Sequence, residues 1–171
     1  DPVVHIDRAA QQVVSRGGRI ESYDRLLIAT GSDPFVIPVP GKDLPGVVTF
    51  RDLDDVETML AAAETSSRAV VIGGGLLGLE AAHGLSLRGM AVTVVHLMPT
   101  LMERQLDEAA GYLLKSELEG RGMTILTGAD TAEIIEQDGR VGGVRLKDGT
   151  EIPADLVVMA VGIRPNTALA K

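Results

Sequence analysis

A glycine-rich turn is the part of the sequence whose residue types and spacing best suit ligand binding. Gly73, Gly75 and Gly78 have the G-x-G-x-x-G spacing, after an apolar β-branched run and before a helical pattern. In this context the first glycine allows a tight turn, the second lets the backbone approach a pyrophosphate, and the third allows close helix–strand packing. The N–H groups that open the helix attract phosphate oxygens. The predicted dinucleotide turn comprises Gly73, Gly74, Gly75, Leu76, Leu77 and Gly78; a glycine turn needed only for packing is the alternative.

The position that usually binds the adenosine ribose carries an unexpected residue. An acidic residue is typical about 20 residues after the glycine turn, at the end of the second strand. His96 stands there instead. A histidine can donate to a ribose hydroxyl or, when cationic, attract a 2′-phosphate, and Arg104 can act similarly. A solvated strand end and a surface arginine explain the two residues equally well, so NADH and NADPH both remain open.

Three further places are candidate contacts for a dinucleotide. Glu80 follows Gly78 closely in an otherwise apolar segment, where a carboxylate is costly unless it faces water or a partner. We expect it to face a cleft and to bond the nicotinamide end, the alternative being an exposed helical glutamate favoured by the helix dipole. Ligands of open α/β sheets lie at the carboxyl edge of the strands. The residues that end two apolar runs at this edge are therefore candidates as well: Ala29, Thr30 and Gly31, and Val161 and Gly162.

These residues require a doubly wound α/β framework to position them. Alternating apolar runs and helical spacing predict the order β-α-β-α-β from residue 69 to residue 126. The predicted strands are 69–72, 91–95 and 123–126, and the predicted helices are 76–88 and 106–118. Short extended runs separated by Asp-Gly turns then predict a β-meander over 131–152. The apolar run 155–162 predicts a final buried strand.

An internal repeat links the two ends of the chain. Residues 23–34 align with 154–165 at a constant offset of 131 positions, so that Gly31 falls on Gly162 and Gly18 falls on Gly149. We therefore expect residues 3–34 to be the tail of an earlier copy of the same unit. About 60 residues of that copy are expected before residue 1, which predicts that the sequence is a piece of a larger protein.

A connector and one more helix are predicted between the two copies. Residues 35–49 are rich in proline and glycine and predict a connecting segment. Residues 51–63 have helical spacing, and either Asp52 or Asp54 is placed to cap the N-terminus of that helix. Two dinucleotide-binding units joined in this way suggest two dinucleotides, one of which passes electrons to the other.

Composition narrows the classes of function. The net charge of −8 argues against a nucleic-acid or anionic-membrane surface, although backbone N–H groups can still bind phosphates. Without cysteine, these residues cannot form disulfides, iron–sulfur clusters or thiolate metal sites. The three histidines lack metal-ligand spacing, so we expect no metal site. No signal peptide or membrane span is visible, and a cytoplasmic location is the expectation. The oligomeric state stays open.

Four strings of residues resemble a known superfamily. Segment 23–31 has the pattern YDxLLIATG, segment 73–82 has GGGxxGxEAA, and segment 154–166 has ADxVVxAVGxRPN. Together they resemble the FAD/NAD pyridine nucleotide–disulphide oxidoreductase superfamily over essentially the whole chain. Segment 95–107, VHLMPTLMERQLD, resembles within it the large subunits of assimilatory NAD(P)H nitrite reductases. Position 76 is leucine where many relatives carry an aromatic residue over the flavin, so that gate is expected to differ.

The resemblance implies a relay of electrons between two cofactors. NADH or NADPH would bind at Gly73–Gly78 with its nicotinamide near Glu80 and Gly162, and would pass hydride to FAD. In nitrite reductases the electrons continue to an iron–sulfur cluster and sirohaem, whose cysteine ligands must lie elsewhere in the parent protein. An NADH oxidase, a rubredoxin or ferredoxin reductase, and a non-catalytic NAD(H)-sensing domain are the alternatives.

The resemblance also implies a three-layer Rossmann-like domain with a β-meander, together with an incomplete piece of a second such domain. The expected partners are the dinucleotides and the remainder of the parent polypeptide. We expect these residues to bind FAD poorly or not at all, to hold a nearly complete NAD site and to include no catalytic residue. The predicted domains are a partial FAD-binding domain at 1–50, a connecting helix at 51–68, an NAD-binding domain at 69–153, and a return strand leading into the remaining FAD segment at 154–171.

Overall fold

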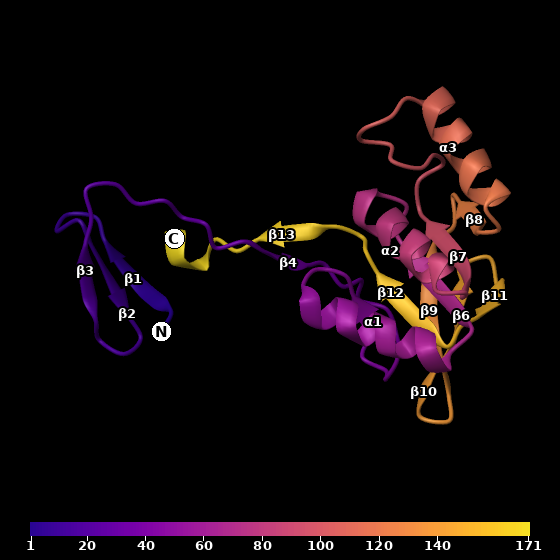
Figure 1. Cartoon of the computed structure of the whole chain (residues 1–171), viewed down its shortest axis with the longest axis horizontal. Coiled ribbons are helices and arrows are strands. Elements are labelled where there is room, and N and C mark those ends of the chain that lie inside the picture. Colours follow the sequence, from indigo (N-terminus) through magenta and orange to yellow (C-terminus); the bar gives the residue numbers. More distant parts are fainter. The chain divides into compact units, whose positions relative to one another are not determined.

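Five parallel strands form the sheet that positions the glycine turn. In the computed structural model, which describes all 171 residues, they run in the order β5-β12-β6-β7-β8 (Figure 1). Their bounds are β5 Val47–Thr49, β12 Leu156–Met159, β6 Arg68–Ile72, β7 Ala91–His96 and β8 Thr124–Thr127. The short β-branched runs of the sequence form the central strands, because a strand covered on both faces needs no polar alternation.

Three helices cover one face of this sheet. They are α1 Leu53–Thr65, α2 Leu76–Leu87 and α3 Glu108–Gly120. Asp52, rather than Asp54, caps α1 by accepting the Asp55 N–H, and Asp107 caps α3 by accepting the Ala110 N–H. The prediction for α3 was partly wrong. The helix begins after its aspartate cap, which leaves Leu106 outside it, and Leu113 is 68% exposed instead of facing the core.

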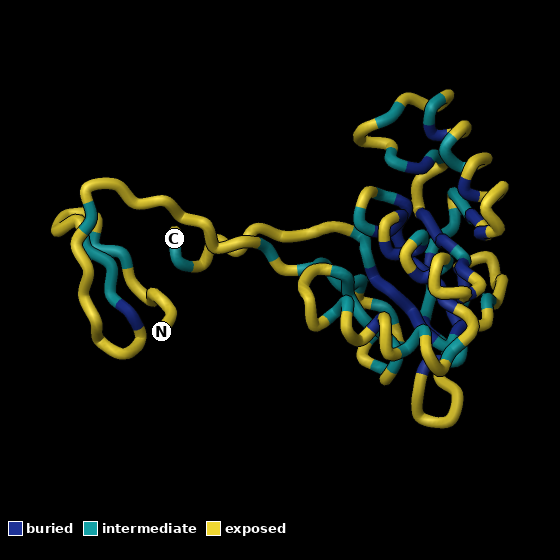
Figure 2. The backbone as a smooth tube through the Cα atoms, in the orientation of Figure 1, coloured by how far each residue is buried: buried dark blue, intermediate teal, exposed yellow.

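A β-meander covers the other face, as predicted. Its strands are β9 Thr131–Gln137, β10 Arg140–Leu146 and β11 Glu151–Pro153, in the antiparallel order β11-β10-β9. Successive strand residues point to opposite faces, so Val71 joins the helices in one core cluster while Val70 joins the meander in the other. The result is the three-layer Rossmann-like arrangement expected from the sequence, with the deepest burial along the strands of the central sheet (Figure 2).

The chain divides into two units, and the sheet, the three helices and the meander belong to the unit 34–162. This unit includes β5 and β12, which were expected to belong to the flanking segments 1–50 and 154–171. The strand β12 is an interior strand of the sheet, paired with β5 on one side and with β6 on the other. No helix of the structure is long and apolar enough to span a membrane.

The smaller unit comprises residues 1–33 and 163–171 and begins with a second meander. Its strands are β1 Val3–Asp7, β2 Gln12–Ser15 and β3 Ile20–Ser22, in the order β1-β2-β3. Shifted by the repeat offset, β3 coincides with β11, and the two meanders have the same strand order. The remaining elements are a two-stranded pair, β4 Ser32–Pro34 with β13 Ile163–Pro165, and a short 3₁₀ helix, η1 Ala168–Ala170; the last residue of β4, Pro34, already belongs to the larger unit.

One expectation about the smaller unit was wrong. Residues 25–29 align with β12 and should form a strand, but they lie in irregular backbone, and Leu27 is 87% exposed. The equivalent strand β12 draws its hydrogen bonds from β5 and β6. No strand in the smaller unit pairs with 25–29. An apolar run without neighbouring strands leaves its backbone groups to water and gains nothing from being extended.

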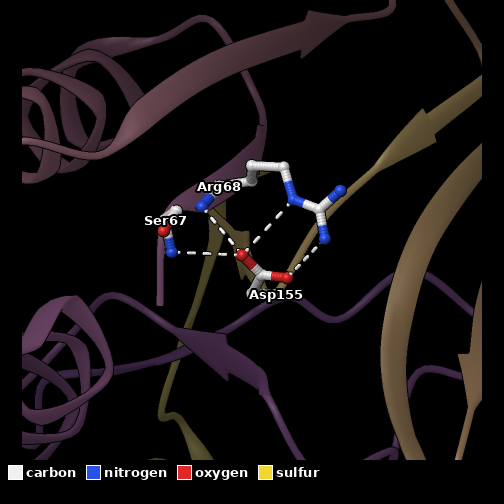
Figure 3. Close-up of polar contacts among 3 residues, drawn as sticks. All are labelled: Ser67, Arg68 and Asp155. Carbon is white, nitrogen blue, oxygen red and sulfur yellow. Dashed lines mark hydrogen bonds and ion pairs between the residues drawn. The ribbon is translucent and has the colours of Figure 1, made fainter. Parts of the chain in front are cut away.

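A polar cluster joins the starts of β6 and β12 in the larger unit (Figure 3). The Asp155 carboxylate accepts the N–H groups of Ser67 at 3.1 Å and Arg68 at 3.0 Å, and it pairs with the Arg68 guanidinium at 2.7 Å. These bonds, led by the one from the Arg68 side chain, lower the pKa of Asp155 to about 2. The cluster thereby holds the two central strands in register at the edge away from the glycine turn.

Candidate dinucleotide-binding site

The glycine turn links β6 to α2 and is held against two neighbouring strands. The Gly73 N–H donates to the Val95 carbonyl at 2.8 Å. Gly73 has φ +121°, and a Cβ atom there would lie 2.2 Å from the carbonyl oxygen of Ala160, just beyond β12. Both its backbone conformation and this close approach exclude a side chain at the position. The first glycine therefore does what the motif predicts: it turns the chain tightly beneath the end of a strand.

The third glycine lets the helix pack onto the turn. A Cβ atom at Gly78 would lie 2.0 Å from the Gly73 carbonyl oxygen, and Gly78 is buried in the first turns of α2. Any side chain here would push the N-terminus of α2 away from the sheet. The distance from the glycine turn to the helix axis is thus set by a residue that lacks a side chain.

The second glycine of the motif has no structural reason to be glycine. Gly75 has φ −89°, which any residue adopts, and a Cβ atom there would meet nothing within 4 Å. It is also the N-cap of α2 and provides no side-chain cap, whereas Asp52 and Asp107 cap the other two helices. The start of α2 therefore combines uncapped backbone N–H groups with open space beside them, which is the geometry that receives an anionic oxygen.

The other candidates around the turn lie at the surface of the same unit. Leu76 is exposed, Leu77 is half-buried, and Glu80 is exposed on α2. Val161 is half-buried and Gly162 is exposed directly after β12, at the carboxyl edge of the sheet. The backbone of Gly162 is anchored there, because its carbonyl accepts the N–H of Phe35 at 2.9 Å. The contacts of Glu80 and Gly162 with a nicotinamide stay predictions.

His96 is oriented inward. Its side chain is buried, with the residue 8% exposed, and Nδ1 accepts the Gly74 N–H at 3.0 Å. Nε2 lies 3.1 Å from Oε2 of Glu103. Because Nδ1 accepts a hydrogen bond, the proton lies on Nε2, which donates to the carboxylate. A Cβ atom at Gly74 would lie 2.7 Å from Cγ of His96, so the ring packs directly on the glycine turn.

Sequence reasoning did not identify Glu103. It follows His96 by seven residues, in a loop with no regular periodicity, and only the fold brings its carboxylate to the imidazole. Arg104, which was a candidate, is exposed on the same loop. The sequence signal that could have indicated Glu103 was its position as a polar residue shortly after the second strand of the unit.

Ala29, Thr30 and Gly31 belong to the smaller unit and are exposed. The expectation that they end a strand was wrong, because no strand of the smaller unit pairs with the segment before them. Their backbone is held by Asn166, whose N–H donates to the Gly31 carbonyl and whose carbonyl accepts the Thr30 hydroxyl. Their contact with a cofactor stays a prediction.

Comparison with known proteins agrees with this geometry. The family model for pyridine nucleotide-disulphide oxidoreductases matches residues 1–171. The chain belongs to this family. Among its relatives, nitrite reductase [NAD(P)H] of Bacillus subtilis is 57% identical over 99% of this chain and 21% of that protein. The nitrite reductase [NAD(P)H] large subunit of Klebsiella oxytoca is 41% identical over all of this chain and 18% of that protein.

A solved structure confirms the fold of this family member. The ferredoxin reductase of Rhodopseudomonas palustris has a TM-score of 0.92 and 34% identity, over 98% of this chain and 42% of that one. The chain thus spans about a fifth of the length of its nitrite reductase relatives and less than half of this reductase. The resemblance inferred from the motifs is confirmed at the level of the family and of the fold.

Proposed function

We propose that residues 34–162 bind NADH or NADPH at the glycine turn and that the parent protein passes its hydride to FAD. The observation that carries this proposal is Gly75. Neither its backbone angle nor any neighbouring atom requires glycine, and the space that a Cβ would occupy borders the uncapped start of α2. A pyrophosphate accounts for both features, because it accepts backbone N–H groups and needs the backbone to come close.

The residues of the turn would divide the binding between them. The N–H groups of Leu76 and Leu77 open α2 and would donate to the pyrophosphate, helped by the positive end of the helix dipole. Val161 and Gly162, at the carboxyl edge of β12, would border the nicotinamide half. When bound, the nicotinamide supplies a hydride that the flavin accepts, while the protein contributes position and the exclusion of water.

We further propose that the parent protein is a nitrite reductase of the NAD(P)H type. Two relatives with that name match nearly the whole chain. An iron–sulfur cluster and sirohaem would then lie outside these residues, which contain no cysteine. The assignment of residues 1–50 and 154–171 to a FAD-binding domain, with 69–153 forming the NAD-binding domain, belongs to the same proposal. The cytoplasmic location stays a prediction.

A ferredoxin reductase is the second candidate, because the R. palustris enzyme with that name shares the fold at a TM-score of 0.92. The two proposals share the NAD site and differ in the electron acceptor. Steady-state oxidation of NADH by the full-length parent, supplied with nitrite or with a ferredoxin, separates them. Absence of any NADH oxidation with added FAD would instead favour a non-catalytic sensing domain.

The direct test of the NAD site is calorimetric titration of this chain with NADH, NADPH and FAD. We expect a reduced or oxidised nicotinamide dinucleotide to bind and FAD to bind weakly. The variant Gly75→Ala should fold, since its Cβ meets no atom and its φ is ordinary. It should weaken dinucleotide binding about tenfold, equivalent to about 1.4 kcal/mol, by keeping the backbone from the pyrophosphate.

Gly84→Ala is the matched control for this variant. Gly84 lies on the same helix α2, and a Cβ atom there also meets nothing within 4 Å. Alanine in a helix interior is preferred over glycine, so this variant should bind as the unmodified chain does and should be slightly more stable. Unchanged affinity of Gly75→Ala for both nicotinamide dinucleotides would contradict the proposed site.

A further inference from the structure

The His96–Glu103 pair occupies the place where the dinucleotide fold usually has one ribose-binding acid. Resting on the proposed NAD site, we propose that Glu103, held in place by His96, is the carboxylate that binds the adenosine ribose and makes the site select NADH over NADPH. His96 is then a positioning residue. The sequence left the ribose contact open between His96 and Arg104. In this proposal the contact is made by Glu103, which neither the motif nor its spacing had indicated.

His96 is unsuited to bind the ribose itself. Its Nδ1 is engaged by the Gly74 N–H and its Nε2 by Glu103. The ring is also enclosed, since an atom placed on Gly74 would meet His96 at 2.7 Å and the buried Leu101 at 2.6 Å. With both nitrogens occupied and the residue buried, the imidazole has no donor left to offer to a ligand.

Glu103 is anchored to the same turn from a second direction. The loop that carries it is tied to the turn by the Met102 N–H, which donates to the Gly74 carbonyl at 3.0 Å. Leu101, directly before it, is 1% exposed and packs against Gly74. The Glu103 carboxylate therefore has a defined position relative to the turn that would hold the pyrophosphate. In dinucleotide-binding folds the adenosine ribose follows the pyrophosphate toward the end of the second strand, so we expect it to come within reach of the same loop.

The carboxylate is accessible as well as positioned. The Glu103 side chain is 29% exposed, against 10% for the His96 side chain. Only Oε2 contacts the imidazole, which leaves Oε1 to accept ribose hydroxyls. The histidine hydrogen bond orients the carboxylate, much as a carboxylate orients a metal-binding or catalytic histidine in the reverse direction.

This arrangement favours NADH for an electrostatic reason. A ribose 2′-hydroxyl donates a hydrogen bond to a carboxylate, whereas a 2′-phosphate carries negative charge and is repelled by it. Arg104 is adjacent in sequence but exposed, where solvent and salt screen its attraction for a phosphate. The carboxylate held by His96 therefore outweighs the exposed arginine.

The test compares the affinity of the chain for NADH and for NADPH, before and after the substitution Glu103→Gln. The unmodified chain should bind NADH at least about tenfold more tightly than it binds NADPH. Glutamine keeps the size of the side chain and its contact with His96 but removes the charge. The variant should lose about tenfold in NADH affinity and should bind NADPH as tightly as before or more tightly.

Three further variants sharpen the comparison. Glu57→Gln removes the same charge from the exposed face of α1 and should leave the NADH to NADPH ratio unchanged. Arg104→Ala should also leave NADH binding unchanged. His96→Gln should lower the ratio of NADH affinity to NADPH affinity. When it is added to Glu103→Gln, it should lower this ratio by less than it does in the otherwise unmodified chain, because the two residues act through one contact.

The outcomes separate this inference from the proposed function. If both dinucleotides bind but Glu103→Gln leaves their ratio unchanged, or if NADPH binds more tightly to the unmodified chain, the role of Glu103 is wrong and the NAD site stands. If neither dinucleotide binds, both proposals are overturned. An imidazole Nε2–H resonance that shifts on NADH addition in the unmodified chain, but not in Glu103→Gln, supports the positioning role of His96.

Discussion

At the scale of single residues, glycine occupies each of the three positions of the motif for a different physical reason. Gly73 is required by a left-handed backbone and by the Ala160 carbonyl, and Gly78 is required by the Gly73 carbonyl. Gly75 is required by neither. The motif as a string treats the three alike. Only the contacts show that two of them build the turn and that the remaining one, Gly75, has open space beside it.

Asp155 provides a residue-scale prediction about the pH dependence of stability. Its pKa is lowered from 3.8 to about 2 in the folded chain by the Arg68 side chain and two backbone N–H groups. A lowered pKa contributes stability above the unfolded value and loses it as the pH falls through the folded value. We expect Asp155→Asn to cost about 1 kcal/mol at neutral pH, a difference that persists down to pH 4 and shrinks between pH 3.8 and 2.

Urea unfolding at a series of pH values measures this difference. Asp43→Asn is the control, because Asp43 forms an exposed ion pair with Lys42 and should contribute little at any pH. A difference between the Asp155 variant and the unmodified chain that stays constant down to pH 2 would show that the carboxylate is not stabilised by folding.

At the scale of elements, helix boundaries follow from their caps. The sequence offered Asp52 and Asp54 as alternatives for α1, and the structure selects Asp52, whose carboxylate accepts the Asp55 N–H while the Asp55 carboxylate accepts the Asp52 N–H. This reciprocal pair is a capping box with aspartate in both positions. Asp52 has the extended backbone angles of an N-cap residue, whereas Asp54, two residues later, already lies inside the helix.

We therefore predict that Asp52→Ala destabilises the larger unit by about 1 kcal/mol, because an N–H group at the start of α1 loses its acceptor. Asp54→Ala should cost less, since Asp54 contributes only its interaction with the helix dipole. Thermal or urea unfolding of both variants gives the comparison. Equal losses in the two variants would mean that the cap has no specific role.

At the scale of the whole molecule, burial is concentrated in one unit. Every buried hydrophobic residue lies between Met59 and Met159, within the unit 34–162. In the smaller unit Ser15 is buried, while Leu26, Leu27 and Ile28 are exposed apolar side chains. The free energy of folding increases with the apolar area that is buried. The backbone hydrogen bonds of the unit 34–162 should therefore open less often than those of the smaller unit.

Amide hydrogen exchange tests this difference. We expect the amides of β6, β7 and β12 to exchange at least about a hundredfold more slowly than those of β1, β2 and β3, because the latter open without exposing a core. The meander β9–β11, which packs on the sheet, is the internal comparison for the meander β1–β3. Equal protection of the two meanders would contradict this account.

The sequence by itself determined the features that depend on local pattern. The β-branched runs, the helical spacing, the Asp-Gly turns and the glycine motif all act within a few residues, so the α/β class, the meander and the glycine turn between a strand and a helix were correctly predicted from them. The repeat was also visible, because it is a comparison of the sequence with itself, and the two meanders have the same strand order.

Only the tertiary structure decided the features that depend on distant partners. Residues 25–29 and β12 are similar in sequence, but only β12 has strands on both sides to receive its backbone hydrogen bonds, so only β12 is a strand. His96 was visible as a residue out of place, but its role depends on Gly74 and Glu103, which the fold brings to its two ring nitrogens. A hydrogen-bonding pattern between residues far apart has no counterpart in local spacing, and this pattern is the reason for proposing Glu103, in place of His96, as the ribose contact.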